Sequence, residues 1–229
     1  LKEDSTGLAF SPDGKTLASS SRDSKIRFWD AERPVRMEWD KVNAIRNREG
    51  SAESQEGQAD KYRDSGQLEK AAAQYKTAGD SWNSLAKDSP QEPTFRFRAI
   101  NCRIFNAYVL ARLGRHAEAG ILADEIPQLL EGVPSNSSHS YLYNLACGFS
   151  QVAVAVSEDS KLSDEERTKQ RDRYAIKAVD LLGSLQSLAY FDSVSNAQLI
   201  EEDSDLDELR TREDFRQIVE KVKVNKSKP

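Results

Sequence analysis

Long apolar segments and a leader-like start are both missing from this 229-residue sequence. No apolar run approaches the ~18–20 residues that span a bilayer, and the first four residues, Leu1-Lys2-Glu3-Asp4, do not resemble a signal peptide. Both absences exclude membrane insertion of this segment. The one methionine is Met37, so we expect the chain to be a piece of a larger protein.

Basic clusters and cysteines are also scarce. The chain has 33 Lys and Arg against 38 Asp and Glu, a net charge of -5, and no block of basic residues. A nucleic-acid partner normally requires a basic patch, so that class is excluded. The two cysteines, Cys102 and Cys147, lie within apolar helical patterns. We expect buried thiols in a reducing, cytoplasmic compartment rather than a disulfide.

Catalytic and metal-binding motifs are absent as well. The sequence has no phosphate-binding Gly loop, no His-Arg-Asp or Asp-Phe-Gly element and no Gly-x-Ser-x-Gly elbow. His116 and His139 have no second ligand at metal spacing, so we expect surface residues. The run Asp203, Asp205, Asp207 and Asp214 invites a calcium site, but Glu208 replaces the glycine that the sixth loop position needs. We expect a solvated acidic loop that caps helices, no metal, no cofactor and no enzyme.

Three short apolar runs separated by turn residues open the chain, between residues 7 and 30. Gly14 permits a positive φ, and Asp13 and Asp23 can bond their own backbone. We expect an antiparallel meander with one apolar face, formed by Ile26 and Phe28 with Leu8, Phe10 and Leu17 near it. Three strands of this length bury too little apolar area to be stable alone.

This stretch resembles a WD-repeat blade. The matching motifs are Phe10-Ser11-Pro12-Asp13-Gly14, Leu17-Ala18-Ser19 and Trp29-Asp30. The resemblance implies a partial blade over residues 1–33, with the missing remainder of its own propeller as a partner, because no second copy of the motif occurs. The alternative is an unrelated hairpin docked on the helical part. For residues 34–56 we expect a linker, interrupted by Pro34, and a polar helix over about 37–47 with an apolar stripe of Trp39, Val42 and Ile45.

From residue 57 to 229 the apolar period is helical, and one frame recurs. The frame is Tyr62, Gly66, Ala71, Tyr75, Ala78; then Leu110, Gly114, Ala119, Ala123, Ile126; then, interrupted, Leu145, Ala146, Phe149 and Ala175, Val179, Leu182. The pattern resembles the tetratricopeptide repeat, in which small residues let paired helices approach closely. We therefore expect a mainly α protein: a tetratricopeptide-like helical repeat array preceded by the β meander. A generic helical bundle is the alternative.

The array is degenerate, and three of its segments carry further expectations. A central helix over residues 94–113 is apolar on nearly all sides, so neighbours should cover it on both flanks. The third unit contains an insertion of about 17 residues. Within it, Ser163 and Glu166 predict a capping box that starts an exposed helix. The six frame alanines, which should mark crowded helix contacts, are Ala59, Ala107, Ala146, Ala71, Ala119 and Ala175.

Residues 143–147, 175–185 and 203–215 resemble the terminal unit of bacterial multidomain proteins. Those proteins join WD repeats and tetratricopeptide repeats, often behind a serine/threonine kinase domain. The resemblance implies that Leu206, Leu209 and Phe215 cover the final helix pair. The tetratricopeptide frame also implies ligand-facing positions on the first helix of each pair: Glu56, Asp60, Arg63, Asn101, Tyr108, Arg112 and Tyr143.

These observations favour a non-enzymatic scaffold that binds another protein or peptide. One alternative is the C-terminal regulatory or substrate-positioning region of a bacterial serine/threonine kinase. The other is a structural cap without a ligand.

Overall fold

The computed structural model describes residues 5–21, 24–30, 34–130 and 135–226. A three-stranded antiparallel sheet is followed by helices, so the predicted class, a mainly α array after a β meander, is confirmed. The chain divides into two compact units, Leu1–Ser51 and Ala52–Pro229. The domain boundaries after residues 33 and 56 remain predictions. Among the described helices, none combines the length and the apolar character needed to cross a bilayer.

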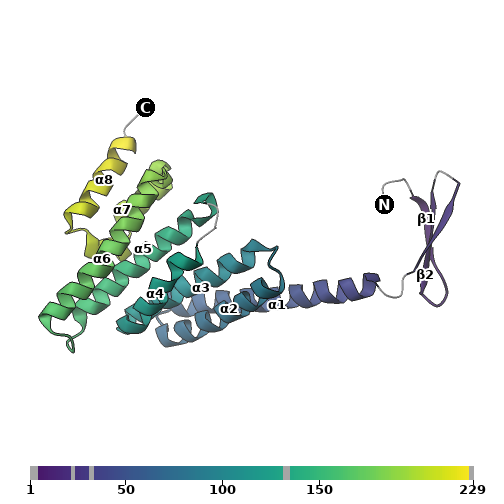
Figure 1. Cartoon of the computed structure of the whole chain (residues 1–229), viewed down its shortest axis with the longest axis horizontal. Helices are drawn as coiled ribbons and strands as arrows, with labels where there is room; N and C mark the ends of the chain where they lie inside the picture. Colours follow the sequence, from purple (N-terminus) through teal and green to yellow (C-terminus); the bar gives the residue numbers. More distant parts are fainter. Residues whose placement is uncertain (1–4, 22–23, 31–33, 131–134, 227–229) are drawn as a thin grey trace. The chain divides into compact units, whose positions relative to one another are not determined.

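Strands β1 (Ser5–Phe10), β2 (Thr16–Ser21) and β3 (Ile26–Asp30) pair in the order β1-β2-β3 (Figure 1). In the first turn Gly14 has a φ of 71°, as predicted. The Asp13 carboxylate accepts from the Ser11 hydroxyl at 2.6 Å and from the Lys15 N–H at 3.1 Å. These bonds lower the pKa of Asp13 and hold the turn closed. Asp23 lies outside the described residues.

The strand register corrects the predicted distribution of apolar side chains. Phe28 lies opposite Ala18, which lies opposite Ala9, whereas Leu17 lies opposite both Phe10 and Trp29. Because directly opposed residues share a face and neighbours along a strand alternate, Ile26 and Phe28 lie on one face. Leu8, Phe10 and Leu17 lie on the other face with Trp29, and not near Ile26 and Phe28. The sheet is therefore apolar on both faces.

Helix α1 (Pro34–Asp64) runs without interruption through the segment expected to hold a linker and a shorter helix. Pro34 starts the helix instead of breaking it, because a proline in the first turn removes no intrahelical hydrogen bond. Good helix formers between residues 46 and 56 outweigh the cost of Gly50. Trp39 and Val42 of the predicted apolar stripe are exposed.

The helical unit contains α2 (Leu68–Asp88), α3 (Pro93–Arg112), α4 (His116–Leu129), α5 (Ser135–Glu158) and α6 (Asp164–Ser187). Consecutive helices pack in antiparallel fashion, and α3 contacts α2, α4 and α5 (Figure 1). This arrangement buries the apolar side chains on several flanks of α3, as expected for the central helix. Cys102 and Cys147 are both buried free thiols.

Two of the helix connections have the same hydrogen bonds at equivalent positions. After α1, the N–H of Gly66 donates to Arg63 and that of Gln67 donates to Tyr62; after α3, Gly114 donates to Ala111 and Arg115 to Leu110. Both glycines adopt positive φ, 73° and 72°, which closes each helix end with minimal steric cost. The predicted recurrence of the Gly-containing turn is thus confirmed in backbone geometry.

The six frame alanines are all buried. Their exposed fractions are 0 % for Ala59, Ala71, Ala119 and Ala146, 1 % for Ala107 and 2 % for Ala175. A methyl group at each helix contact permits close approach of the two backbones, because no larger side chain separates them. The sequence frame therefore located the helix contacts correctly.

The segment predicted to contain an insertion lies in α5, in α6 and in the loop between them, and the two helices have 24 residues each. At the start of α6 the Ser163 hydroxyl accepts from the Glu166 N–H, and the Glu166 carboxylate accepts from the Ser163 N–H. The predicted capping box is present. His116 is 12 % exposed and bonds Asp159 at 2.8 Å, so it is not the surface residue expected; it links α4 to the loop between α5 and α6.

The C-terminal segment covers the last helix pair. It comprises η1 (Tyr190–Asp192), α7 (Val194–Glu202), η2 (Ser204–Leu209) and α8 (Glu213–Lys226). η2 packs against α5, and α8 packs against α6. Leu206, Leu209 and Phe215 are buried to 2 % exposure or less, which places them where the resemblance implied.

Candidate partner-binding site

The sheet presents its largest apolar side chains to solvent. Phe28 is 72 % exposed and Ile26 64 % on one face, and Phe10 is 65 % exposed on the other. Ser19 is the one buried side chain among those described for the sheet, and its hydroxyl accepts from the Trp29 indole N–H at 2.9 Å. Large apolar groups uncovered on both sides of a thin sheet are typical of a surface that another polypeptide covers.

The predicted α1 positions lie in a polar network that joins α1 to α2 and α3. The Glu56 carboxylate accepts from the Trp82 indole at 3.0 Å and from Arg98 at 3.1 Å. Asp60 accepts from the Tyr75 hydroxyl, and Arg63 donates to the same hydroxyl at 2.7 Å. These side chains hold three helices together and keep part of their surface in solvent.

The predicted α3 positions differ in their surroundings. Arg112 is exposed and lies 5.8 Å from the centre of the Tyr108 ring. The Tyr108 hydroxyl donates to Asp205 at 2.9 Å, and burial together with this carboxylate raises the pKa of Tyr108 to about 12. The Asn101 Oδ1 atom is buried and has no hydrogen-bond partner among the described residues. Tyr108 is therefore a protonated donor that is already engaged.

Tyr143, the predicted position on α5, is buried at 4 % exposure. Its hydroxyl donates to Asp203 at 2.9 Å, and burial together with Cys147 and Asp203 raises its pKa well above the ordinary value. The Asp203 carboxylate also caps η2 by accepting from the Asp205 N–H. The acidic loop is consequently a helix cap, as expected, but Asp203 and Asp205 pack against tyrosines instead of being fully solvated.

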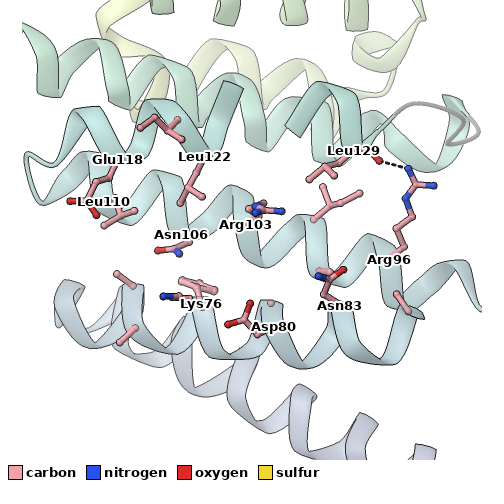
Figure 2. Close-up of a pocket in the computed structure, with 18 of the residues that line it drawn as sticks. Lys76, Asp80, Asn83, Arg96, Arg103, Asn106, Leu110, Glu118, Leu122 and Leu129 are labelled. Carbon is pink, nitrogen blue, oxygen red and sulfur yellow. Dashed lines mark hydrogen bonds between the residues drawn. The ribbon is translucent and has the colours of Figure 1, made fainter. Parts of the chain in front are cut away.

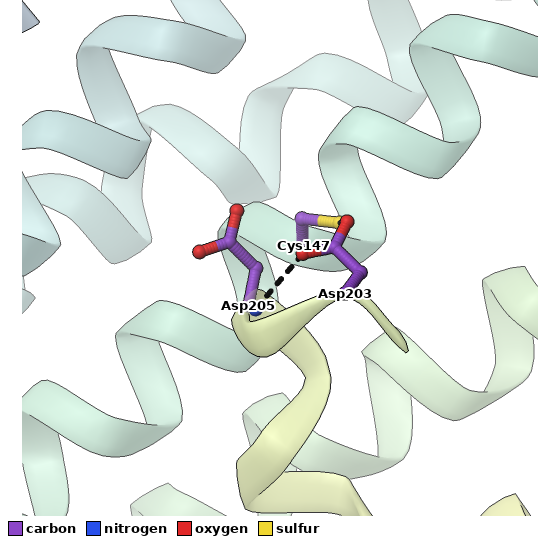
Figure 3. Close-up of side chains that lie close together, drawn as sticks. All are labelled: Cys147, Asp203 and Asp205. Carbon is purple, nitrogen blue, oxygen red and sulfur yellow. Dashed lines mark hydrogen bonds between the residues drawn. The ribbon is translucent and has the colours of Figure 1, made fainter. Parts of the chain in front are cut away.

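Cys147, Asp203 and Asp205 form the one cluster in the described part of the chain with metal-like spacing (Figure 3). One ligand atom of each residue lies within 4.8 Å of the others. The Cys147 thiol donates to Asp203 at 3.8 Å, and burial together with the two carboxylates raises its pKa well above the ordinary value. The hydrogen bonds of Asp203 to Cys147, Tyr143 and the Asp205 N–H favour a structural network. The absence of a metal stays a prediction.

The seven predicted residues lie on α1, α3 and α5, and their exposure differs. Arg112 is exposed, Asp60 and Arg63 are partly exposed, and Tyr143 is buried. The partners that sequence reasoning missed are Asp203 and Asp205. Their signal was the alternation of acidic residues before Leu206, which matched a loop that caps a short helix.

Residues 3–30 match the family described as WD domain, G-beta repeat. The match covers the sheet and ends at the Trp29-Asp30 pair on which the resemblance rested. No curated protein and no solved structure matches the chain. The family evidence is therefore a WD40 repeat in the N-terminal unit.

Proposed function

We propose that this chain is a non-enzymatic protein–protein interaction scaffold. The observation that carries the proposal is a WD40 repeat whose large apolar side chains are exposed on both faces. Burying an apolar side chain of this size contributes about 1.5–3 kcal/mol, so a protein that covers either face gains substantial binding free energy. The first partner we propose is the remaining part of a WD-repeat propeller, in a cytoplasmic setting.

The helical unit is proposed to be a tetratricopeptide-like array that presents a second interaction surface. Support comes from the two equivalent turns at Gly66 and Gly114 and from the buried frame alanines. Among the predicted ligand-facing residues, Arg112 is exposed and Asp60 and Arg63 are partly exposed. A regulatory role beside a serine/threonine kinase stays the alternative.

The test uses the full chain as bait, with Phe10→Ser and Phe28→Ser as variants of the two sheet faces. Lys15→Ser, in the exposed turn, is the matched control. Captured proteins are identified by mass spectrometry, purified and titrated calorimetrically. We expect at least one partner whose affinity falls about tenfold or more, equal to ~1.4 kcal/mol, in one sheet variant and not in the control. Partners that bind all three variants equally, or no purified partner that binds, would contradict the proposal.

A further inference from the structure

A groove separates α2 from α4, and α3 forms its floor (Figure 2). Its volume is about 740 Å³. Both flanking helices pack against α3, so the groove lies between the second helices of two consecutive pairs. It is distinct from the predicted ligand-facing positions, which belong to the first helices α1, α3 and α5.

About half of the groove's lining residues, 10 of 21, are small or aliphatic, and most of the others are charged or amide side chains. Small residues on the α2 wall and on the floor leave room for a backbone to approach closely: Ala72, Ala73, Gly79, Ala86 and Ala99. The α4 wall adds larger apolar side chains, among them Leu122 and Ile121, which is 63 % exposed. Such a surface favours an apolar ligand face.

Asn106 is an uncharged polar residue of the α3 floor, next to the apolar residues Ala99, Ile100 and Leu110. It is 9 % exposed and lines the groove (Figure 2), and its Oδ1 atom has no hydrogen-bond partner among the described residues. A buried acceptor without a donor costs about 1–3 kcal/mol. A ligand that brings a hydrogen-bond donor to this oxygen would remove that cost.

Charges on the two walls are arranged differently. On the α4 wall, Glu125 pairs with Arg103 of the floor at 3.3 Å, and Glu118 pairs with Arg115 at 2.6 Å. Along α2, by contrast, the lining residues Glu69, Lys76, Asp80 and Lys87 have no ion pair in the described part of the chain. Figure 2 shows Lys76 and Asp80 at successive positions on this wall. Because the free charges are spread along the helix, they suit an extended ligand with several charges better than one charged head group.

We propose that this groove binds an amphipathic helix of a partner protein, with small or aliphatic residues toward the alanines of α2 and α3, one hydrogen-bond donor toward Asn106, and acidic residues toward Lys76 and Lys87. The lining residues of α2 extend from Glu69 to Lys87, roughly 27 Å at the rise of an α-helix. That length accepts a helix of about 18 residues. The inference rests on the proposed scaffold function and specifies one partner class for it.

The test selects helical peptides of about 18 residues from a phage-displayed library on the full chain and measures one synthesised, fluorescein-labelled winner by anisotropy. The Ala73→Trp variant fills the groove, and the Lys76→Glu/Lys87→Glu double variant replaces two positive charges on its wall with negative ones. All three positions are exposed, so the variants should fold. Matched controls are Ala117→Trp and Lys169→Glu, exposed positions outside the groove.

We expect the winner to carry apolar residues at helical spacing with acidic flanks. Its Kd should rise about tenfold or more with both groove variants and less than about twofold with the controls. A peptide with its Glu residues changed to Lys should recover affinity for the double variant. Equal binding to Ala73→Trp, failure to select any peptide, or binding of dodecanoate alone would overturn the helix site. A different result would contradict the scaffold function: partners captured by the full chain would bind the Phe10→Ser and Phe28→Ser variants as tightly as the unchanged protein.

Discussion

At the residue scale, the carboxyl of Asp205 combines burial with a neutral donor. The carboxylate accepts a hydrogen bond from the Tyr108 hydroxyl, and the Gln151 side chain donates to the backbone oxygen of Asp205 at 3.2 Å. Burial raises the pKa of Asp205 above its ordinary value of 3.8, although Tyr108, Arg112 and Arg63 oppose the rise. The folded protein therefore holds this proton more tightly than the unfolded chain does.

That difference predicts a pH dependence of stability. Because the folded pKa is raised, the stability linked to Asp205 is complete below pH 3.8 and is lost as pH rises through the folded pKa. The Asp205→Asn variant has no titrating group at this position. As pH rises through the same range, its free energy of unfolding should therefore increase relative to that of the wild type. Urea unfolding of both proteins from pH 3.5 to 7 measures the difference, and a difference that does not change with pH would contradict the prediction.

The buried alanines predict a second residue-scale effect. Ala107→Leu adds three carbons at a position with 1 % exposure, and overpacking of this kind costs about 1–3 kcal/mol. Ala117→Leu, on the exposed side of α4, should change stability by less than about 0.5 kcal/mol. Urea midpoints of the two variants provide the comparison. Equal midpoints would mean that Ala107 does not mark a tight helix contact.

At the scale of elements, glycines in turns and glycines in helices should respond oppositely to the same substitution. Gly114→Ala places a side chain at a φ of 72°, which costs about 1–2 kcal/mol in the left-handed region. Gly57 lies within α1 and an added Cβ there meets no atom within 4 Å, so Gly57→Ala should stabilise by about 0.5–1 kcal/mol. Thermal unfolding of the two variants should shift Tm in opposite directions; shifts of the same sign would refute this reading of the turn.

At the scale of the whole molecule, the two units differ in how much of their apolar surface is covered. The helical unit has an extended core that includes Trp82, Tyr75 and Phe149. The sheet has exposed aromatic residues on both faces and one described buried side chain, Ser19. Independent stability is therefore expected of the first and not of the second.

Fragments test this difference. Residues 52–229 should unfold cooperatively in urea, and a peptide of residues 1–33 should have the circular dichroism of an unordered chain. The reason is that three short strands without a covered face bury too little area to offset chain entropy. A peptide with dispersed amide resonances in its NMR spectrum would show that the sheet needs no covering partner.

Local pattern alone determined several parts of this protein correctly. The turn at Gly14, the capping box of Ser163, the helix turns at Gly66 and Gly114 and the contact alanines depend on short-range geometry and on helical periodicity, which a sequence displays directly. The WD40 match likewise rests on a contiguous motif. Each of these features is encoded within a few neighbouring residues.

Tertiary structure decided the rest. Strand register put Leu8 and Phe10 on the face opposite Phe28, because a pairing shift of one residue exchanges the faces. The pairing of Tyr108 and Tyr143 with Asp205 and Asp203 joins residues 97 and 60 positions apart. Such contacts depend on how helices that are distant in the sequence pack together, and no local sequence pattern specifies that packing.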